Sequence, residues 1–222
     1  MKYAHRAFVA GAATILAAVG TANESIDGGW RGTLVTGAGT ELSVDLVIRS
    51  AGDGYGAYLD GRQRPAVSGG RASDVNVSDG VVRVAFDALG AVFEGAFAGH
   101  SLAGHWRQPG TDLPLTLVAY PRPAPGPDEI ERFAGIWSAS IDGLPIELRF
   151  EVDELGELVC AITVVPEDFT FSAGLVAVDG ASMRLEAPRL GVMTASVIGD
   201  AMTAELRASG GGVSFRATRG RR

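Results

Sequence analysis

The sequence has one lysine, one cysteine and three histidines, and these shortages exclude several kinds of catalytic chemistry. Lys2 lies in an amino-terminal leader, so we expect the mature chain to have no lysine for a Schiff base, a Ser-Lys dyad or a phosphate loop. Cys160 alone can form neither an intramolecular disulfide nor a thiolate metal cluster. It alternates with Ile162 and Val164 in ELVCAITV, a pattern that predicts a buried core side chain.

Positive charge is also scarce, since the formal net charge is −7. Loss of the leader would remove Lys2 and Arg6 and make the chain more acidic. Nucleic acids and anionic lipids are bound mostly through Lys and Arg side chains that contact phosphate. The composition therefore argues against a nucleic-acid partner.

The first residues have the pattern of a secretory signal peptide. MKYAHR supplies a positive start, AFVAGAATILAAVG an apolar segment of about 14 residues, and Gly20-Thr21-Ala22 a small-residue cleavage site. A membrane-spanning helix, the alternative, needs roughly 20 apolar residues. We predict a signal peptide over residues 1–22, a periplasmic or secreted mature protein, and no membrane span after cleavage. No cysteine follows directly, which argues against a lipoprotein anchor.

No stretch after the leader shows a sustained helical period. Apolar and polar residues alternate over short stretches between turn signals such as AGDGYG and QPGTD, as in antiparallel strands. The strand candidates of the first half are WRGTLV, ELSVDLVIR, YGAYLD, SDVNVS, VVRVAFD, AVFEGAFA, SLAGHWRQ and PLTLVAY. Those of the second half are GIWSASI, LPIELRFEV, ELVCAITV, FTFSAGLVAV, SMRLEAP, VMTASVIG, AMTAELRA and VSFRATR. We predict an all-β fold of two tandem antiparallel β-meander units, lipocalin-like barrels or sandwiches of about eight strands each.

The two halves resemble copies of one unit on either side of a proline-rich break, PRPAPGP. Trp30 near the start of the first half matches Trp137 in the second, and DEIERFAG after the break could form one helical turn. Other matches are Leu89-Gly90 with Leu190-Gly191, Gly99 with Gly199, Leu102 with Met202, and Leu117 near Phe215. The predicted organisation is a first repeat at 28–121, a linker at 122–131 and a second, diverged repeat at 132–219.

The first repeat carries the patterns WxGxL, LxVxLxI, GAxFEG, GxxLxGxWxQ and LPLxL. Together these resemble the small all-β domain that precedes α/β-hydrolase or peptidase domains in bacterial secreted proteins. The resemblance implies an accessory fold, because the nucleophile of such hydrolases lies in the following domain within a GxSxG elbow. This sequence contains no elbow of that form. An exported hydrolase is therefore an expected class of partner, and hydrolase activity of this chain is not expected.

Candidate site residues concentrate between Gly90 and Gly110. Strand alternation places Trp106 and Gln108 on one face of SLAGHWRQ, and His105 and Arg107 on the other. If Phe93 and Phe97 point inward, Glu94 points outward; if they point outward, Glu94 points inward with Trp106. The sequence leaves both orientations of Glu94 possible. His100 and His105 are too far apart along one extended chain to share a metal ion, and no metal or cofactor is predicted. Glu147 and Glu151 share the solvated face of a strand, which argues against a glycosidase pair.

Two functions remain open from the residues alone. The first is a non-catalytic exported β-barrel module that binds a small apolar or amphipathic ligand, or a partner enzyme, with Trp30, Glu94, Trp106 and Gln108 as candidate ligand-binding residues. For Trp30 and Trp106, their bulk favours one shared core over platforms that stack against a ligand. The alternative is a small hydrolase-type enzyme with its site at Glu94, His105 and Gln108. A membrane barrel is disfavoured because the strands are short and poor in aromatic residues.

Overall fold

A computed structural model describes residues 25–59, 70–187, 191–208 and 210–220. The predicted signal peptide lies outside these ranges. The strands of the first unit are β1 (Gly28–Val35), β2 (Glu41–Ala51), β3 (Gly54–Leu59), β4 (Gly70–Arg71), β5 (Asp74–Ser78), β6 (Val81–Phe86), β7 (Ala91–Ala98), β8 (Ser101–Gln108) and β9 (Thr111–Tyr120). Those of the second unit are β10 (Gly135–Ile141), β11 (Leu144–Val152), β12 (Leu158–Val164), β13 (Phe169–Asp179), β14 (Ser182–Ala187), β15 (Gly191–Ile198), β16 (Ala201–Ala208) and β17 (Gly211–Arg219). Helix α1 (Pro127–Phe133) lies between the units, and the short 3-10 turns η1 (Asp87–Leu89) and η2 (Val165–Glu167) follow β6 and β12.

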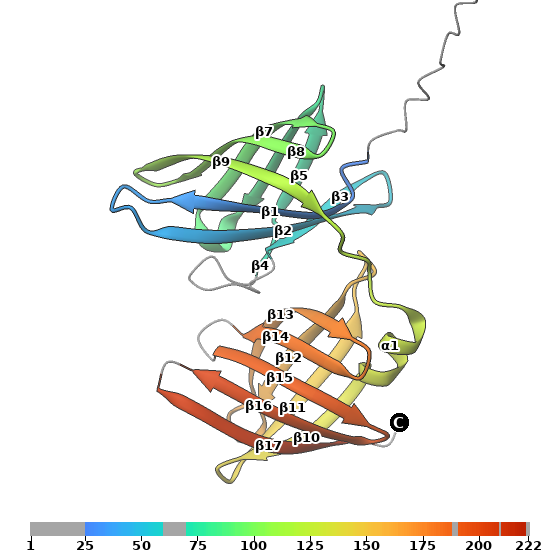
Figure 1. Cartoon of the computed structure of the whole chain (residues 1–222). Coiled ribbons are helices and arrows are strands. Elements are labelled where there is room, and N and C mark those ends of the chain that lie inside the picture. The colour runs from blue at the N-terminus through green and yellow to red at the C-terminus, as the bar shows by residue number, and fades with distance from the viewer. Residues whose placement is uncertain (1–24, 60–69, 188–190, 209, 221–222) are drawn as a thin grey trace, which may run out of the picture.

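The predicted all-β fold of two successive meanders is confirmed (Figure 1). The second unit is a closed eight-stranded barrel in which β10 pairs with β17. The first unit is a curled sheet in the order β4-β3-β2-β1-β9-β8-β7-β6-β5. Every strand candidate of the sequence overlaps an observed strand, because alternation of apolar and polar residues is the pattern of a sheet with one buried face. Asp60 and Pro188, the last residues of YGAYLD and SMRLEAP, lie outside the described residues.

The edges of the first sheet approach each other along the segment from β4 to β5. The backbone N–H of Ala72 donates to the carbonyl of Ala57 in β3 at 2.8 Å, and that of Ser73 donates to Ala85 in β6 at 2.8 Å. The chain thus passes from pairing with β3 to pairing with β6. Strand β13 does the same in the second unit, since its first part pairs with β12 and its last four residues with β14. Strands β4 and β5 together therefore correspond to β13, and both units follow one eight-strand plan.

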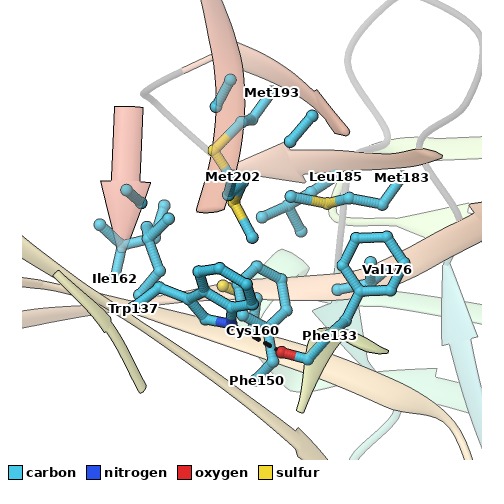
Figure 2. Packing of buried hydrophobic residues seen from close by; sticks show 14 of the residues in the cluster. Phe133, Trp137, Phe150, Cys160, Ile162, Val176, Met183, Leu185, Met193 and Met202 are labelled. Atoms are coloured by element: carbon cyan, nitrogen blue, oxygen red, sulfur yellow. Dashed lines mark hydrogen bonds between the residues drawn. The ribbon is translucent and has the colours of Figure 1, made fainter. Parts of the chain in front are cut away.

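Each unit has its own apolar core, filled by large side chains; the units are called the first and the second barrel below, although only the second is closed by strand pairing. In the first unit Trp30, Phe86, Phe93 and Trp106 belong to one buried cluster, so the prediction that the two tryptophans share a core is confirmed. In the second unit the cluster combines aromatic residues with three methionines, as Figure 2 shows: Phe133, Trp137, Phe150, Met183, Met193 and Met202. Cys160 lies in this second core as predicted. Burial raises the pKa of its thiol, so the sulfur stays protonated and inert.

The two tryptophans that open the repeats are held in the same way. The indole N–H of Trp30 donates to the carbonyl of Ile26 at 2.8 Å, and that of Trp137 donates to the carbonyl of Phe133 at 2.8 Å. Each acceptor lies four residues before its tryptophan, and the second hydrogen bond is drawn in Figure 2. Identical local geometry at both positions supports the predicted duplication.

One detail of the predicted organisation differs from the structure. Leu102 pairs with Leu117 across β8 and β9, whereas Met202 pairs with Ala217, so Ala217 rather than Phe215 corresponds to Leu117. The helical turn predicted in DEIERFAG is observed as α1, which begins at Pro127 within the predicted linker 122–131. Proline is well suited to a first helical position, since the N–H that it lacks would have no partner there.

Candidate functional site

The polar residues singled out in β7 and β8 meet on the outer face of the first barrel. Phe93 is buried, so Glu94 points outward, which settles the alternative that the sequence left open. Glu94 lies opposite His105 in the β7–β8 register. The Nδ1 atom of His105 lies 2.6 Å from Oδ1 of Asp112, and Arg107 lies 3.4 Å from Asp112 and 3.7 Å from Glu94. These four side chains are 42–56% exposed.

The remaining candidates lie elsewhere. Gln108 has the inward parity that the sequence predicts, but it stands at the exposed end of β8, where its Nε2 atom donates to the carbonyl of Leu89 at 3.3 Å. Trp30 and Trp106 are buried in the core. The structure therefore brings Glu94 and His105 together and separates both from Gln108 and from the tryptophans. The ligand-binding role of these residues stays a prediction.

The cluster of Glu94, His105, Arg107 and Asp112 is an open ion-pair network. The hydrogen bond from His105 is the main cause that lowers the pKa of Asp112, and Arg107 lowers it further. A His-Asp pair is also part of a hydrolytic triad, but a triad works where water is excluded and charges interact strongly. Here the side chains are about half exposed, and water weakens their interactions.

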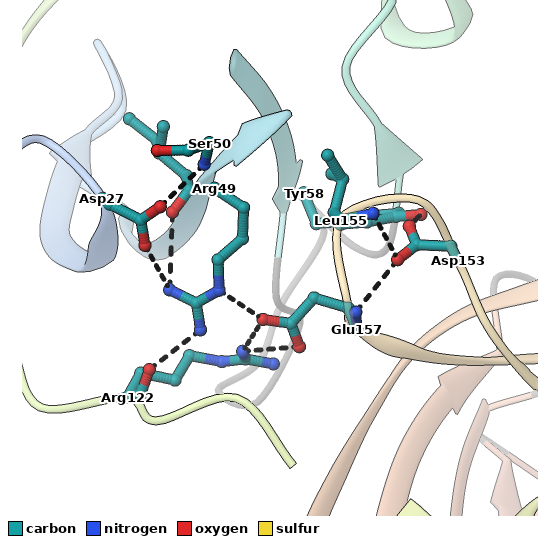
Figure 3. A network of polar contacts seen from close by, with 9 residues as sticks. Asp27, Arg49, Ser50, Tyr58, Arg122, Asp153, Leu155 and Glu157 are labelled. Atoms are coloured by element: carbon teal, nitrogen blue, oxygen red, sulfur yellow. Dashed lines mark hydrogen bonds and ion pairs between the residues drawn. The ribbon is translucent and has the colours of Figure 1, made fainter. Parts of the chain in front are cut away.

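A second polar group, which sequence reasoning missed, joins the two barrels (Figure 3). Glu157 is fully buried in the loop between β11 and β12. Its carboxylate accepts a hydrogen bond from Nε of Arg49 in β2 at 2.7 Å, and Nη1 of Arg122 lies 2.9 Å from both of its oxygens. Arg49 also donates to the carbonyl of Arg122 at 2.9 Å and to Asp27 at 3.3 Å. The loop, the first barrel and the interbarrel segment are thus fixed together.

The β11–β12 loop, Asp153–Glu157, is shaped by its first residue. Oδ1 of Asp153 accepts the backbone N–H groups of Leu155 and Glu157, each at 3.0 Å, which is the local hydrogen bonding that favours Asp in turns. The other oxygen of Asp153 accepts the hydroxyl of Tyr58 from β3 at 2.5 Å. Burial is the main cause that raises the pKa of Tyr58, and its bond to Asp153 raises it further.

Leu155 at the tip of this loop makes an apolar contact between the barrels. It forms a small buried cluster with Val47, Tyr58 and Leu175. The contact is close, because a Cβ atom at Gly56 of β3 would lie 2.6 Å from the methyl carbons of Leu155. Two signals in the sequence could have indicated the contact. Val47 is apolar on the outward parity of β2, and Leu155 is apolar amid the acids of DELGE.

A hollow of about 570 Å³ adjoins this contact and has walls from both barrels. Its apolar surface comes from side chains that include Val152, Val159 and Ala161 of the second barrel. Its polar surface consists of Tyr58 and Arg71 of the first barrel and Glu151, Asp153 and Glu154 of the second. Arg71 is bonded to Glu154, and this bond is the main cause that raises the pKa of Arg71 and lowers that of Glu154.

Comparisons with known proteins show no close relative. No protein-family model matches the sequence, and a search of curated proteins finds no match. Among solved structures the chain is similar to a “putative outer membrane protein” of Bacteroides fragilis NCTC 9343, with 11% identity, a TM-score of 0.28, and coverage of 88% of this chain and 98% of that one. A protein of unknown function from Nostoc punctiforme PCC 73102 has 14% identity, a TM-score of 0.27, and coverage of 88% and 96%. Kievitone hydratase from Nectria haematococca has 10% identity, a TM-score of 0.21, and coverage of 88% and 90%. None of the three indicates an activity for this chain.

Among the residues that the structure describes, no helix is both long and apolar enough to cross a membrane. No group of three or more His, Cys, Asp or Glu side chains in the same part of the chain could hold a metal ion.

Proposed function

We propose that the protein is a non-catalytic, exported module that binds a small amphipathic molecule in the hollow between its barrels. The observation that carries the proposal is that both barrels build the walls of this hollow. Ligand sites are often found at domain interfaces, and a volume of about 570 Å³ is within the usual range for small-molecule sites. The barrel interiors are filled by large side chains, which favours a site between the barrels over one inside them.

The lining residues favour one kind of ligand. The hollow is lined by three acidic residues, Glu151, Asp153 and Glu154, and by one basic residue, Arg71. A ligand with a positively charged or N–H-rich end fits this balance of charge, and an apolar body fits the wall that includes Val152 and Val159. We therefore expect an amphipathic amine to bind more tightly than a fatty acid of the same length.

The test compares two tryptophan substitutions of exposed valines. Val152→Trp would place a large side chain in the hollow, whereas Val118→Trp lies on β9 outside it, and the two valines are 41% and 53% exposed. We expect calorimetry to detect dodecylamine binding to the wild-type protein and to Val118→Trp, with at least tenfold weaker binding to Val152→Trp. Dodecanoate is the anionic control. Equal binding of dodecylamine by both variants would contradict the proposal.

Native mass spectrometry of the protein purified from an exporting host separates this function from the alternatives. A small-molecule adduct that is lost in Val152→Trp supports the proposal. A hydrolase that co-purifies without any adduct would replace the small ligand with the partner enzyme expected from the sequence.

A further inference from the structure

The outer face of β2 and β3 in the first barrel binds a turn of the same chain. Leu155, at the tip of the β11–β12 loop, lies over Gly56 and packs against Tyr58. Two residues later, Glu157 binds Arg49 of β2, with Nε and Oε1 2.7 Å apart (Figure 3). This face therefore holds a turn through an apolar side chain and, two residues on, a charged one.

The strand registers identify the same face on the second barrel. Leu46 of β2 lies opposite Trp30, and Leu148 of β11 lies opposite Trp137, so the two leucines occupy the same place in the repeats. Residues at equal distances from these leucines are therefore equivalent, as are their partners in β3 and β12. The equivalent residues are Arg49 and Glu151, Gly56 and Val159, and Tyr58 and Ala161.

On the second barrel this face is a wall of the hollow between the barrels. Val159 and Ala161 are only partly buried, and Glu151 is exposed. Because Ala161 is much smaller than Tyr58, it leaves room for an apolar group beside Val159. Val159 also packs against the buried cluster around Leu155, so the wall is continuous with an apolar contact. The second barrel thus offers an accessible apolar patch next to a carboxylate.

The charged position has the opposite sign in the second barrel. Arg49 binds a carboxylate, whereas Glu151 is itself a carboxylate. Glu151 forms no ion pair with any residue that the structure describes. Arg149, two residues before it on β11, lies 3.4 Å from Glu147, which is in the opposite direction along the strand. The face on the second barrel therefore suits a turn that carries a cation.

We propose that the hollow binds a turn of a partner protein that presents an apolar side chain and, two residues later, an arginine or a lysine. The apolar side chain lies against Val159 and Ala161, and the cation binds Glu151. This inference rests on the function proposed above, because it takes the same hollow as the binding site. It names the class of ligand that supplies the cationic end and the apolar body.

Neither connection of this chain at the corresponding place supplies such a turn. The β11–β12 loop carries Glu157, which has the wrong charge for Glu151 and is buried within its own chain. The β2–β3 connection consists of Gly52 and Asp53, and it has no apolar side chain to present. A different protein is therefore a better fit than a second copy of this chain.

The test uses peptides that copy the spacing of Leu155 and Glu157. The probe is acetyl-Asn-Gln-Leu-Gly-Arg-amide, and its control is acetyl-Asn-Gln-Leu-Gly-Glu-amide. We expect calorimetry to show at least tenfold tighter binding of the arginine peptide to the wild-type protein. Replacing leucine by alanine in this peptide should weaken binding at least tenfold, because the contact with Val159 and Ala161 is lost.

Substitutions of Glu151 test the charged contact. Glu151→Arg should reverse the preference between the two peptides, because it recreates the charge of Arg49. Glu147→Arg makes the same exchange on the same strand outside the hollow and should keep the wild-type preference. Glu151→Gln preserves the shape of the side chain and should abolish the preference, which decides the outcome if Glu151→Arg fails to fold.

Dodecylamine separates this inference from the function on which it rests. If dodecylamine binds but the peptides do not bind, or bind equally, the inference is overturned and the function proposed for the hollow stands. If the arginine peptide binds with the expected preference and dodecylamine does not bind, the inference is supported and the aliphatic ligand is excluded. A preference for arginine that persists in Glu151→Gln would also overturn the inference.

Discussion

Arg49 of the first barrel and Glu157 of the second are 108 residues apart in sequence, yet they form a buried ion pair with Nε and Oε1 separated by 2.7 Å. Arg122 from the interbarrel segment binds the same carboxylate. Breaking such a pair on one side leaves charge in a poorly solvated place, which is costly. The carboxylate of Glu157 therefore holds two buried guanidinium groups.

Glu157→Gln should lower the free energy of unfolding by about 3–5 kcal/mol, because Arg49 and Arg122 would lose their shared counter-ion. Denaturant titration measures the loss. Glu154→Gln, in the same loop, is the matched control and should change stability little, since its ion pair with Arg71 is exposed. Equal losses of unfolding free energy in the two variants would contradict the stabilising role assigned to the buried ion pairs of Glu157.

Trp106→Ala should destabilise the protein by about 3 kcal/mol or more, because it opens a cavity in the core that Trp106 shares with Trp30, Phe86 and Phe93. Thermal and denaturant unfolding measure the change. His105→Ala, on the neighbouring outward position of the same strand, is the control and should be nearly neutral. If Trp106→Ala kept full stability but lost a bound ligand, the ring would be a binding element rather than a core residue.

Tyr58 should make the protein sensitive to alkali. Its pKa is raised in the folded state, first by burial and then by Asp153, so its contribution to stability is present below its ordinary pKa of about 10 and is lost as pH rises above that value. The wild type should therefore lose stability relative to Tyr58→Phe between about pH 10 and pH 11. Urea titrations of both proteins at each pH measure the difference. The pKa of Cys160 is raised as well, but Cys160 is present in both proteins and affects both equally. The same dependence of stability on pH in wild type and Tyr58→Phe would therefore contradict the role of Tyr58.

His105→Ala should raise the pKa of Asp112 toward its ordinary value, because the hydrogen bond with His105 is the main cause of its depression. Carboxyl NMR shifts followed over pH measure it. A depressed pKa contributes stability above the ordinary value near 3.9, and this contribution is lost as pH falls through the folded value. The control, Gln108→Ala, points away from Asp112 and should leave its pKa unchanged.

The same His105→Ala variant tests the hydrolase alternative. If the protein is a binding module, hydrolysis of p-nitrophenyl acetate by wild type and variant should be equal and close to the rate in buffer. A wild-type activity that the variant lost would support an enzyme site built on His105 and Asp112.

The outward orientation of Glu94 could have been predicted from the sequence. Strand alternation alone allows Glu94 to point either inward or outward. The turn between β7 and β8 contains two residues, Gly99 and His100, and a turn of this length places Phe93 opposite Trp106. Since Trp106 was already expected inside, the hairpin register places Phe93 inside and Glu94 outside. Strand alternation and turn length together therefore predict the orientation of Glu94.

The contact between the barrels is different, because no local pattern connects its two sides. Arg49 lies on a strand face that normally faces solvent, and Glu157 lies in a loop of acids. A charged residue in either setting is predicted to be exposed. Arg49 and Glu157 are buried only because the two units dock against each other. The candidate hollow between the barrels depends on the same docking, so periodicity could not reveal it.

The shape of the contact also bears on assembly. The five-residue loop between β11 and β12 inserts against the outer face of β2 and β3, so the two repeats meet head to tail through unlike surfaces. Contacts of this type can add further units without end and form fibres. The corresponding connection in the first repeat, between β2 and β3, has only Gly52 and Asp53 and offers no such projection. The first repeat therefore has no equivalent of Leu155 or Glu157 with which to dock onto a further repeat.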